Sequence, residues 1–194
     1  MILYLHGFQS SPLSFKAQLI ARELDALGSD CRYICPELPL SPAKSVEMAI
    51  NEIEKHPSDS ITLIGSSLGG YYAGWLAERC HCRAVLLNPV IDPWKIKILD
   101  DMPEKRDLKV REWLDFRKKY EEELKTLRIT RITYPARYLL LAAKGDELLD
   151  WQLMQSHYKD ANQIIIDGSD HGLSTFSQYL DRVLLFCGVK NVAK

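Results

Sequence analysis

Short apolar runs alternate with longer amphipathic stretches along this chain, and the alternation predicts the order of its secondary structure. The apolar runs are mostly continuous, which is typical of strands covered on both faces. We expect six strands, at Ile2–Leu5, Cys31–Cys35, Ile61–Ile64, Ala84–Leu87, Arg137–Ala142 and Gln163–Ile166. The expected helices lie between and after them, at Ser14–Leu27, Ala43–His56, Leu68–Arg79, Trp151–Tyr158 and Thr175–Phe186.

The repeated strand–helix order predicts a parallel sheet with right-handed crossovers and helices on both faces. The expected fold class is therefore α/β, a three-layer α/β/α sandwich around a mainly parallel sheet of about six strands. One interval, from Asn88 to Arg137, contains no convincing strand. Its charged segment Glu104–Arg128 has apolar residues at the spacing of one helix face, namely Trp113, Phe116, Tyr120, Leu124 and Leu127. We expect a helical, cap-like insertion over about 92–133 within a single domain, 1–194.

Composition narrows the class of protein. The 194 residues carry 25 Lys+Arg against 26 Asp+Glu, a net charge of −1, which argues against a nucleic-acid partner. No apolar run approaches the roughly 18 residues that a membrane-spanning helix needs, and no signal peptide is recognisable. The 5 cysteines are odd in number and fit reduced thiols, so we expect a cytoplasmic protein. The sequence does not predict an oligomeric state.

The most specific local motif is Gly65-Ser66-Ser67-Leu68-Gly69, which joins an expected strand directly to an expected helix. This is the G-x-S-x-G pattern of a nucleophile elbow, in which a sharp turn exposes the central serine and glycines relieve crowding. The helix that follows directs free N–H groups at a developing oxyanion. The alternative interpretation is a glycine-rich turn that only caps a helix.

A serine nucleophile needs a base and an acid that orients the base. In this motif's usual chain order the acid precedes the histidine, and both follow strands. His171 comes just after the last expected strand and is the candidate base. Asp146 follows the preceding strand and is the candidate acid, with Glu147, Asp150 and Asp92 as alternatives.

Two backbone N–H groups are expected to form the oxyanion hole. The N–H of Leu68 follows the nucleophile, and the N–H of Phe8 lies in the loop after the first strand. His6 and Gly7 in that loop are expected beside the substrate, where Gly7 lets the backbone approach closely. The cysteines lack the paired spacing of a zinc site, so we expect no metal.

Together these motifs resemble the α/β-hydrolase superfamily and, within it, the small bacterial YqiA/YcfP-type esterase family. The resemblance is carried by Leu3–Phe8 with Ser10-Ser11-Pro12, Gly65–Tyr72, Asn88-Pro89, Gly145–Asp150 and His171. It implies a reduced α/β-hydrolase fold and a serine esterase or thioesterase with a Ser67–Asp146–His171 triad and no cofactor. The section from Lys95 to Thr133 matches least.

The sequence thus predicts a serine hydrolase whose partner is a small-molecule ester or thioester. Two other classes stay open. One is a flavodoxin-like nucleotide- or flavin-binding module, with Phe8-Gln9-Ser10-Ser11 as its phosphate loop. The other is a non-catalytic interaction protein on a hydrolase fold.

Overall fold

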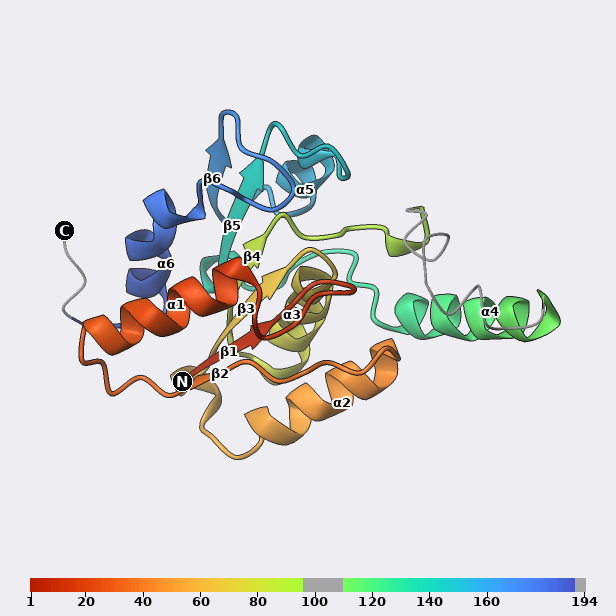
Figure 1. Ribbon diagram of the computed structural model, residues 1–194, viewed down its shortest axis with the longest axis horizontal. Coiled ribbons are helices and arrows are strands. Elements are labelled where there is room, and N and C mark those ends of the chain that lie inside the picture. The colour runs from red at the N-terminus through yellow and green to blue at the C-terminus, as the bar shows by residue number, and fades with distance from the viewer. Residues whose placement is uncertain (96–109, 191–194) are drawn as a thin grey trace.

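A computed structural model describes residues 1–95 and 110–190 of the chain (Figure 1). Its centre is a sheet of six strands in the order β2-β1-β3-β4-β5-β6, and every neighbouring pair is parallel. The strands are β1 (Ile2–Leu5), β2 (Tyr33–Ile34), β3 (Thr62–Ser66), β4 (Arg83–Leu87), β5 (Tyr138–Ala143) and β6 (Asn162–Ile166). The predicted α/β class and the six strands are confirmed.

Six α-helices of the described residues surround the sheet. They are α1 (Phe15–Ala26), α2 (Pro42–Ile53), α3 (Leu68–Cys80), α4 (Val110–Thr126), α5 (Trp151–His157) and α6 (Leu180–Phe186). Alternate strand residues face two separate apolar cores, with Leu3 and Leu5 in one and Ile2 and Tyr4 in the other. Helices α2, α3, α4 and α5 contribute to the first core and α1 and α6 to the second, so the layers are those of a three-layer sandwich.

Two elements are shorter than predicted. The expected strand Cys31–Cys35 reduces to Tyr33–Ile34, because this edge segment pairs with β1 alone and both residues stay partly exposed. The expected helix Thr175–Phe186 begins as a 3-10 turn at Phe176–Tyr179 and becomes α6 at Leu180. Propensity does not distinguish these forms, since pairing and packing decide them.

The amphipathic insertion forms α4, which extends away from the sheet in Figure 1. Its predicted apolar face is turned inward: Trp113, Tyr120 and Leu124 are buried, as is Leu127 directly after the helix, and Phe116 is partly buried. Of the predicted insertion before Val110, Pro93–Lys95 forms a 3-10 turn, and residues 96–109 lie outside the described residues.

Two polar contacts attach α4 to the rest of the fold. The Tyr71 hydroxyl on α3 donates a buried hydrogen bond of 2.7 Å to the Leu124 carbonyl. The Glu123 carboxylate accepts hydrogen bonds from the Ser41 hydroxyl (2.7 Å) and the Ala43 N–H (3.2 Å) at the start of α2. A carboxylate is favourable there because the first N–H groups of a helix have no partners within it.

The strand order places a topological switch between β1 and β3. The chain leaves β1 through α1 on one face of the sheet and leaves β3 through α3 on the other. Loops that depart in opposite directions open a crevice at the carboxyl ends of the two strands, which is where α/β sheets bind ligands. His6 and Ser67, each just after one of these strands, lie at this crevice.

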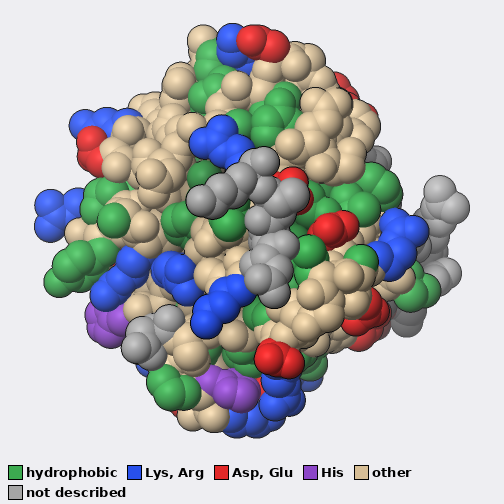
Figure 2. Space-filling model, turned by 90° about the vertical axis from the view of Figure 1, so that its left-hand side faces the viewer, with side chains coloured by type: hydrophobic (Ala, Val, Ile, Leu, Met, Phe, Trp, Pro, Cys, Tyr) green, Lys and Arg blue, Asp and Glu red, His purple; other side chains and the backbone are tan. Residues whose placement is uncertain are grey.

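The surface carries both signs of charge. Figure 2 shows the face on the left-hand side of Figure 1, where Lys and Arg side chains are interspersed with Asp and Glu and with hydrophobic groups. Acidic and basic residues are nearly equal in number in the sequence, and on this face they are also intermingled. None of the helices within residues 1–95 and 110–190 is both long and apolar enough to cross a bilayer.

Candidate active site

Ser67 occupies a sharp turn between β3 and α3. Its backbone has φ 54° and ψ −117°, a combination that L-residues adopt only under strain. The turn also brings backbone into close contact, since a Cβ at Gly69 would collide with the Leu5 carbonyl and one at Gly65 with the Gly69 carbonyl. Glycine at both positions is therefore required for β3 to turn directly into α3 while α3 packs against the end of β1.

A chain of hydrogen bonds connects Ser67 to the loops after β5 and β6. The Nε2 atom of His171 lies 3.0 Å from the Ser67 hydroxyl oxygen, and its Nδ1 atom lies 2.9 and 3.0 Å from the two carboxylate oxygens of Asp146. An ionised carboxylate only accepts hydrogen bonds, so Nδ1 carries the imidazole proton. Nε2 is then free to accept the proton of the serine hydroxyl.

Asp146 is the acid that the structure brings to His171. Its side chain is fully buried, and Oδ1 also accepts the N–H groups of Leu148 and Leu149 at 2.9 and 2.8 Å. The close packing of Gly145 against the Ser169 carbonyl joins the two loops, because a Cβ at position 145 would collide there.

The three alternative acids are placed elsewhere. Asp92 pairs with Lys95 at 2.6 Å, and Asp150 accepts the Gln152 N–H at the start of α5. Glu147 does contact His171, but its carboxylate accepts the backbone N–H at 2.9 Å rather than a ring nitrogen. It therefore holds the loop and not the imidazole.

The loop after β1 passes directly over Ser67. A Cβ on Gly7 would lie 3.3 Å from the Ser67 Cβ and 3.9 Å from its hydroxyl oxygen. Among the described residues, no acceptor meets the N–H of Phe8 in this loop or the N–H of Leu68 at the start of α3. Two free backbone donors are thus available on the two residues predicted to supply them.

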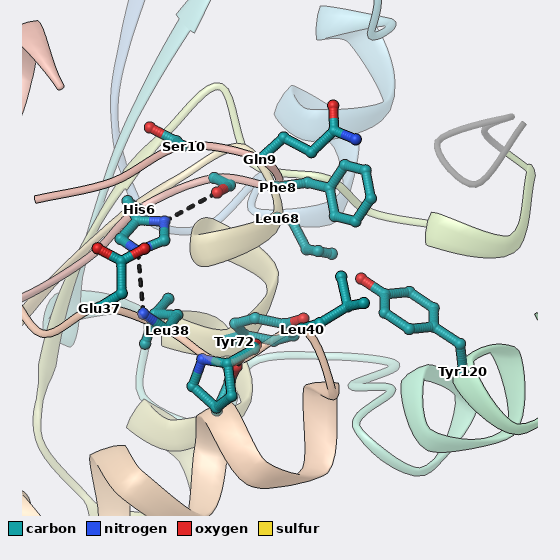
Figure 3. Close-up of a pocket in the computed structure, with 13 residues that line it drawn as sticks. His6, Phe8, Gln9, Ser10, Glu37, Leu38, Leu40, Leu68, Tyr72 and Tyr120 are labelled. Atoms are coloured by element: carbon teal, nitrogen blue, oxygen red, sulfur yellow. Dashed lines mark hydrogen bonds between the residues drawn. The ribbon is translucent and has the colours of Figure 1, made fainter. Parts of the chain in front are cut away.

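His6 is buried, with 4% of its surface exposed, and both of its ring nitrogens are engaged. Nδ1 lies 3.0 Å from the Gly7 carbonyl oxygen, and Nε2 accepts the Leu38 N–H at 3.1 Å, as the dashed lines in Figure 3 show. The acceptor role of Nε2 places the proton on Nδ1. His6 lines the adjacent cavity, yet its polar atoms join the loop after β1 to the segment after β2.

Asn88 is a buried residue at the site that motif reasoning did not assign a role. It follows β4 with φ 42°, a conformation that asparagine tolerates better than most residues, and it is 0% exposed. Its amide nitrogen donates to the carbonyls of Asp170 and His171 at 3.0 and 3.1 Å, and its amide oxygen accepts the Ala143 N–H at 2.8 Å. Two sequence signals point to it: a polar residue directly after a buried strand, and its place in the Asn88-Pro89 pair that carries part of the family resemblance.

Lys16 on α1 reaches the far side of the same loop and donates a 2.5 Å hydrogen bond to the Gly172 carbonyl. Burial lowers the pKa of Lys16 to about 8, and the carboxylates of Asp170 and Asp146 oppose this effect. The loop that bears His171 is therefore held from β4 by Asn88, from the β5 loop by Glu147 and from α1 by Lys16.

A cavity of about 190 Å³ opens beside the crevice, under the loop after β1. Its walls come from that loop, from the segment after β2, from α3 and from α4 (Figure 3). Of the three aromatic residues on the apolar face of α4, Tyr120 lines this cavity, whereas Trp113 and Phe116 do not.

The described residues contain no group of three or more His, Cys, Asp or Glu side chains arranged to hold a metal ion. The five cysteines are free thiols, and burial raises the pKa of Cys82 and of Cys187 to about 12. Thiols of this kind are poor metal ligands and poor nucleophiles at neutral pH.

Sequence comparison places the chain among bacterial relatives of similar length. The uncharacterised protein family UPF0227 matches residues 1–188. A UPF0227 protein of Serratia proteamaculans is 28% identical over 193 residues, covering 96% of this chain and 98% of that protein. The UPF0227 protein YcfP of Salmonella paratyphi A is 25% identical with the same coverage. The resemblance inferred from the motifs is confirmed.

Similar solved structures identify the fold. The hyperthermophilic esterase from Pyrobaculum calidifontis superposes with a TM-score of 0.66 at 17% identity, covering 99% of this chain and 77% of that one. The esterase Pf2001 of Pyrococcus furiosus has a TM-score of 0.65 at 17% identity, covering 96% of this chain and 79% of that one. Mouse alpha/beta hydrolase domain-containing protein 10 has a TM-score of 0.64 at 16% identity, covering 96% of this chain and 86% of that one. The fold is that of the α/β hydrolases.

Proposed function

The chain belongs to the uncharacterised protein family UPF0227, and on this premise we propose that it is a serine hydrolase that cleaves carboxylic esters or thioesters. Ser67 is the nucleophile, His171 the general base and Asp146 the orienting acid. The observation that carries the proposal is the continuous hydrogen-bonded series from the Ser67 hydroxyl through both ring nitrogens of His171 to a buried Asp146 carboxylate.

The proposed reaction runs through an acyl-enzyme. The Ser67 oxygen attacks the acyl carbon while His171 Nε2 takes its proton, and Asp146 stabilises the imidazolium without accepting that proton. The free N–H groups of Phe8 and Leu68 donate to the oxyanion of the tetrahedral intermediate. Its collapse breaks the ester C–O or thioester C–S bond, and His171 protonates the leaving oxygen or sulfur to give the alcohol or thiol. Water, deprotonated by His171, then attacks the acyl carbon; the bond to the Ser67 oxygen breaks, the acid is released, and His171 returns the proton to Ser67.

The proposal is tested with a fluorophosphonate probe and with p-nitrophenyl butyrate hydrolysis. The wild-type protein should be labelled and active. Ser67→Ala should lose labelling, and its kcat should fall by on the order of 10³-fold or more. Ser66→Ala is the matched control, because it removes the neighbouring hydroxyl in the same motif and should retain labelling.

Labelling that persists in Ser67→Ala, or its absence from the folded wild-type protein, contradicts the proposal. The flavin-binding alternative leaves the Ser67–His171–Asp146 series without a role. It would be favoured by flavin absorbance in the purified protein together with the absence of labelling.

A further inference from the structure

The cavity beside Ser67 contains a buried hydroxyl group without a partner. Tyr120 is 3% exposed, lines the cavity, and has no hydrogen bond at its hydroxyl in the described part of the chain. Figure 3 shows the ring reaching in from α4 with its hydroxyl end beside Leu40. A buried hydroxyl that lacks a hydrogen bond is unfavourable, so a ligand that supplies one is bound in preference to a ligand that does not.

Tyr72 on α3 strengthens this argument. It is 4% exposed and lines the same cavity, and its hydroxyl is close enough to that of Tyr120 for the two to interact, although they do not adopt the geometry of a hydrogen bond. Each tyrosine carries one O–H donor. Even if the two hydroxyls rotated to bond one another, one of the two donors would remain for the cavity's occupant.

The charges around the pair select a neutral occupant. Glu37 is the charged residue among those that line the cavity, and Glu123 lies near both tyrosines, where it adds to the effect of burial in raising the pKa of each. No lysine or arginine of the described residues lines the cavity. A ligand carboxylate in this cavity would meet like charge and no lining cation. The ligand group that accepts a hydrogen bond from the tyrosine hydroxyl is therefore uncharged.

The position of the cavity relative to His171 identifies the part of the substrate that enters it. The leaving group must lie against His171 Nε2, which protonates it, but His171 does not line the cavity. The cavity is instead lined by Gly7, Phe8 and Leu68, on the side of the proposed oxyanion donors. The acyl part of the substrate therefore occupies it.

On the basis of the proposed function, we propose that this enzyme prefers esters whose acyl group carries a neutral oxygen acceptor, and that Tyr120 is the residue that binds this oxygen. Keto, ether and hydroxyl oxygens have the required chemistry. The volume, about 190 Å³, fits a short acyl group, because a cavity of about 150 Å³ in another protein binds benzene. Phe8, Leu38 and Leu68 are apolar members of the cavity wall, and they contact the carbon chain in this proposal.

The test compares shape-matched ester pairs. One pair is p-nitrophenyl 4-oxopentanoate and 4-methylpentanoate, and the second is the 5-oxohexanoate and 5-methylhexanoate esters. Each kcat/KM is divided by the rate of alkaline hydrolysis of the same ester, which removes differences in intrinsic reactivity. In the wild-type enzyme we expect the oxo ester of at least one pair to exceed its methyl partner by about 10-fold or more.

Tyr120→Phe should reduce that ratio to near 1, through a loss of kcat/KM that is about 10-fold greater for the oxo ester than for its methyl partner. Its melting temperature should not fall, because the deleted hydroxyl has no partner in the fold. Tyr134→Phe is the matched control, since that tyrosine is 58% exposed, and it should keep the wild-type ratio.

Each other outcome contradicts a specific statement. Ratios near 1 in both pairs of the wild-type enzyme, or a ratio that persists in Tyr120→Phe, overturn the assignment of Tyr120 while ester hydrolysis itself stands. If kcat/KM for p-nitrophenyl hemisuccinate, after the same correction, exceeds that for the 4-oxopentanoate ester, the statement that the acceptor is neutral is overturned. Failure of the folded wild-type protein to hydrolyse any of these esters overturns the proposed function, and the assignment with it.

Discussion

Buried polar side chains around the site have their hydrogen-bonding groups engaged by the fold, and this gives each of them an identifiable role. Asp146 accepts from His171 and from two backbone N–H groups, while His6 joins two loops through its two ring nitrogens. Asn88 links β4, β5 and the loop that bears His171. Tyr120 differs from these three because its hydroxyl has no such partner. For this reason we propose that the hydroxyl donates a hydrogen bond to the substrate.

Replacing Asn88 with alanine should destabilise the protein and impair the site. One buried and two partly buried backbone groups would lose their partner, and alanine is strained at φ 42°. We expect the free energy of unfolding in urea to fall by about 3 kcal/mol. If His171 is then poorly positioned, kcat should fall more than KM rises.

Asn162→Ala provides the comparison, because Asn162 is exposed and donates only a 3.3 Å hydrogen bond to the Tyr138 carbonyl. The Asn162→Ala substitution should lower the free energy of unfolding by less than about 1 kcal/mol. Equal losses for the two variants would contradict the role assigned to Asn88.

Helices and strands present these residues through the loops at their ends. The close approaches at Gly65, Gly69 and Gly145 set how α3 meets β1 and how the β5 loop meets the β6 loop. Helix α4 is attached by the Tyr71–Leu124 hydrogen bond and by Glu123 at the start of α2, which together position Tyr120. Helix α1 contributes Lys16 to the loop of His171.

The contact between α1 and that loop should be sensitive to pH. Burial lowers the pKa of Lys16 from 10.5 to about 8, so the unfolded chain binds more protons than the folded chain between these values. The stability contributed by this group is therefore present above pH 10.5 and is lost as the pH falls through 8.

The stability difference between wild-type protein and Lys16→Met, measured by urea unfolding, should consequently change from pH 7.5 to pH 10.5. The wild-type protein should gain about 1–2 kcal/mol in free energy of unfolding relative to the variant. This is less than the full pKa shift of Lys16 would give, because the side chain is partly exposed. A difference that stays constant over this range would show that Lys16 is not desolvated.

The molecule as a whole is organised by its strand order. Because β1 and β3 meet at the topological switch and all strands are parallel, the loops after β1, β3, β5 and β6 converge at one edge of the sheet. Residues as distant as Ser67 and His171 come within 3.0 Å in this way.

The prediction of a single domain leads to a simple expectation for the whole chain. Residues of α4 share one apolar core with the strands and with α3, so the insertion should not unfold separately. Far-UV circular dichroism and the fluorescence of a variant that keeps Trp113 as its only tryptophan, which then reports on α4, should give coincident urea transitions. Two resolved transitions would assign the insertion its own folding unit.

Local chemistry accounts for much of what was predictable from the sequence. The apolar runs predicted the strands, the spacing from Trp113 to Leu127 predicted the buried face of α4, and Gly65-Ser66-Ser67-Leu68-Gly69 predicted a sharp turn after a strand. Each of these depends on side chains near one another in the chain. The same reasoning overestimated β2, because an edge strand depends on how far its single neighbour can pair with it.

Amino-acid order alone thus determined the α/β class, the position of the serine turn and the candidates for base and acid, because steric and periodic constraints act over a few residues. Tertiary structure decided which carboxylate meets His171 and which side chains support its loop. It also decided which aromatic residue of α4 enters the cavity. Those outcomes depend on contacts between segments far apart in the chain, 104 residues for Ser67 and His171 and 156 for Lys16 and Gly172, and on the cost of leaving buried polar groups unpaired.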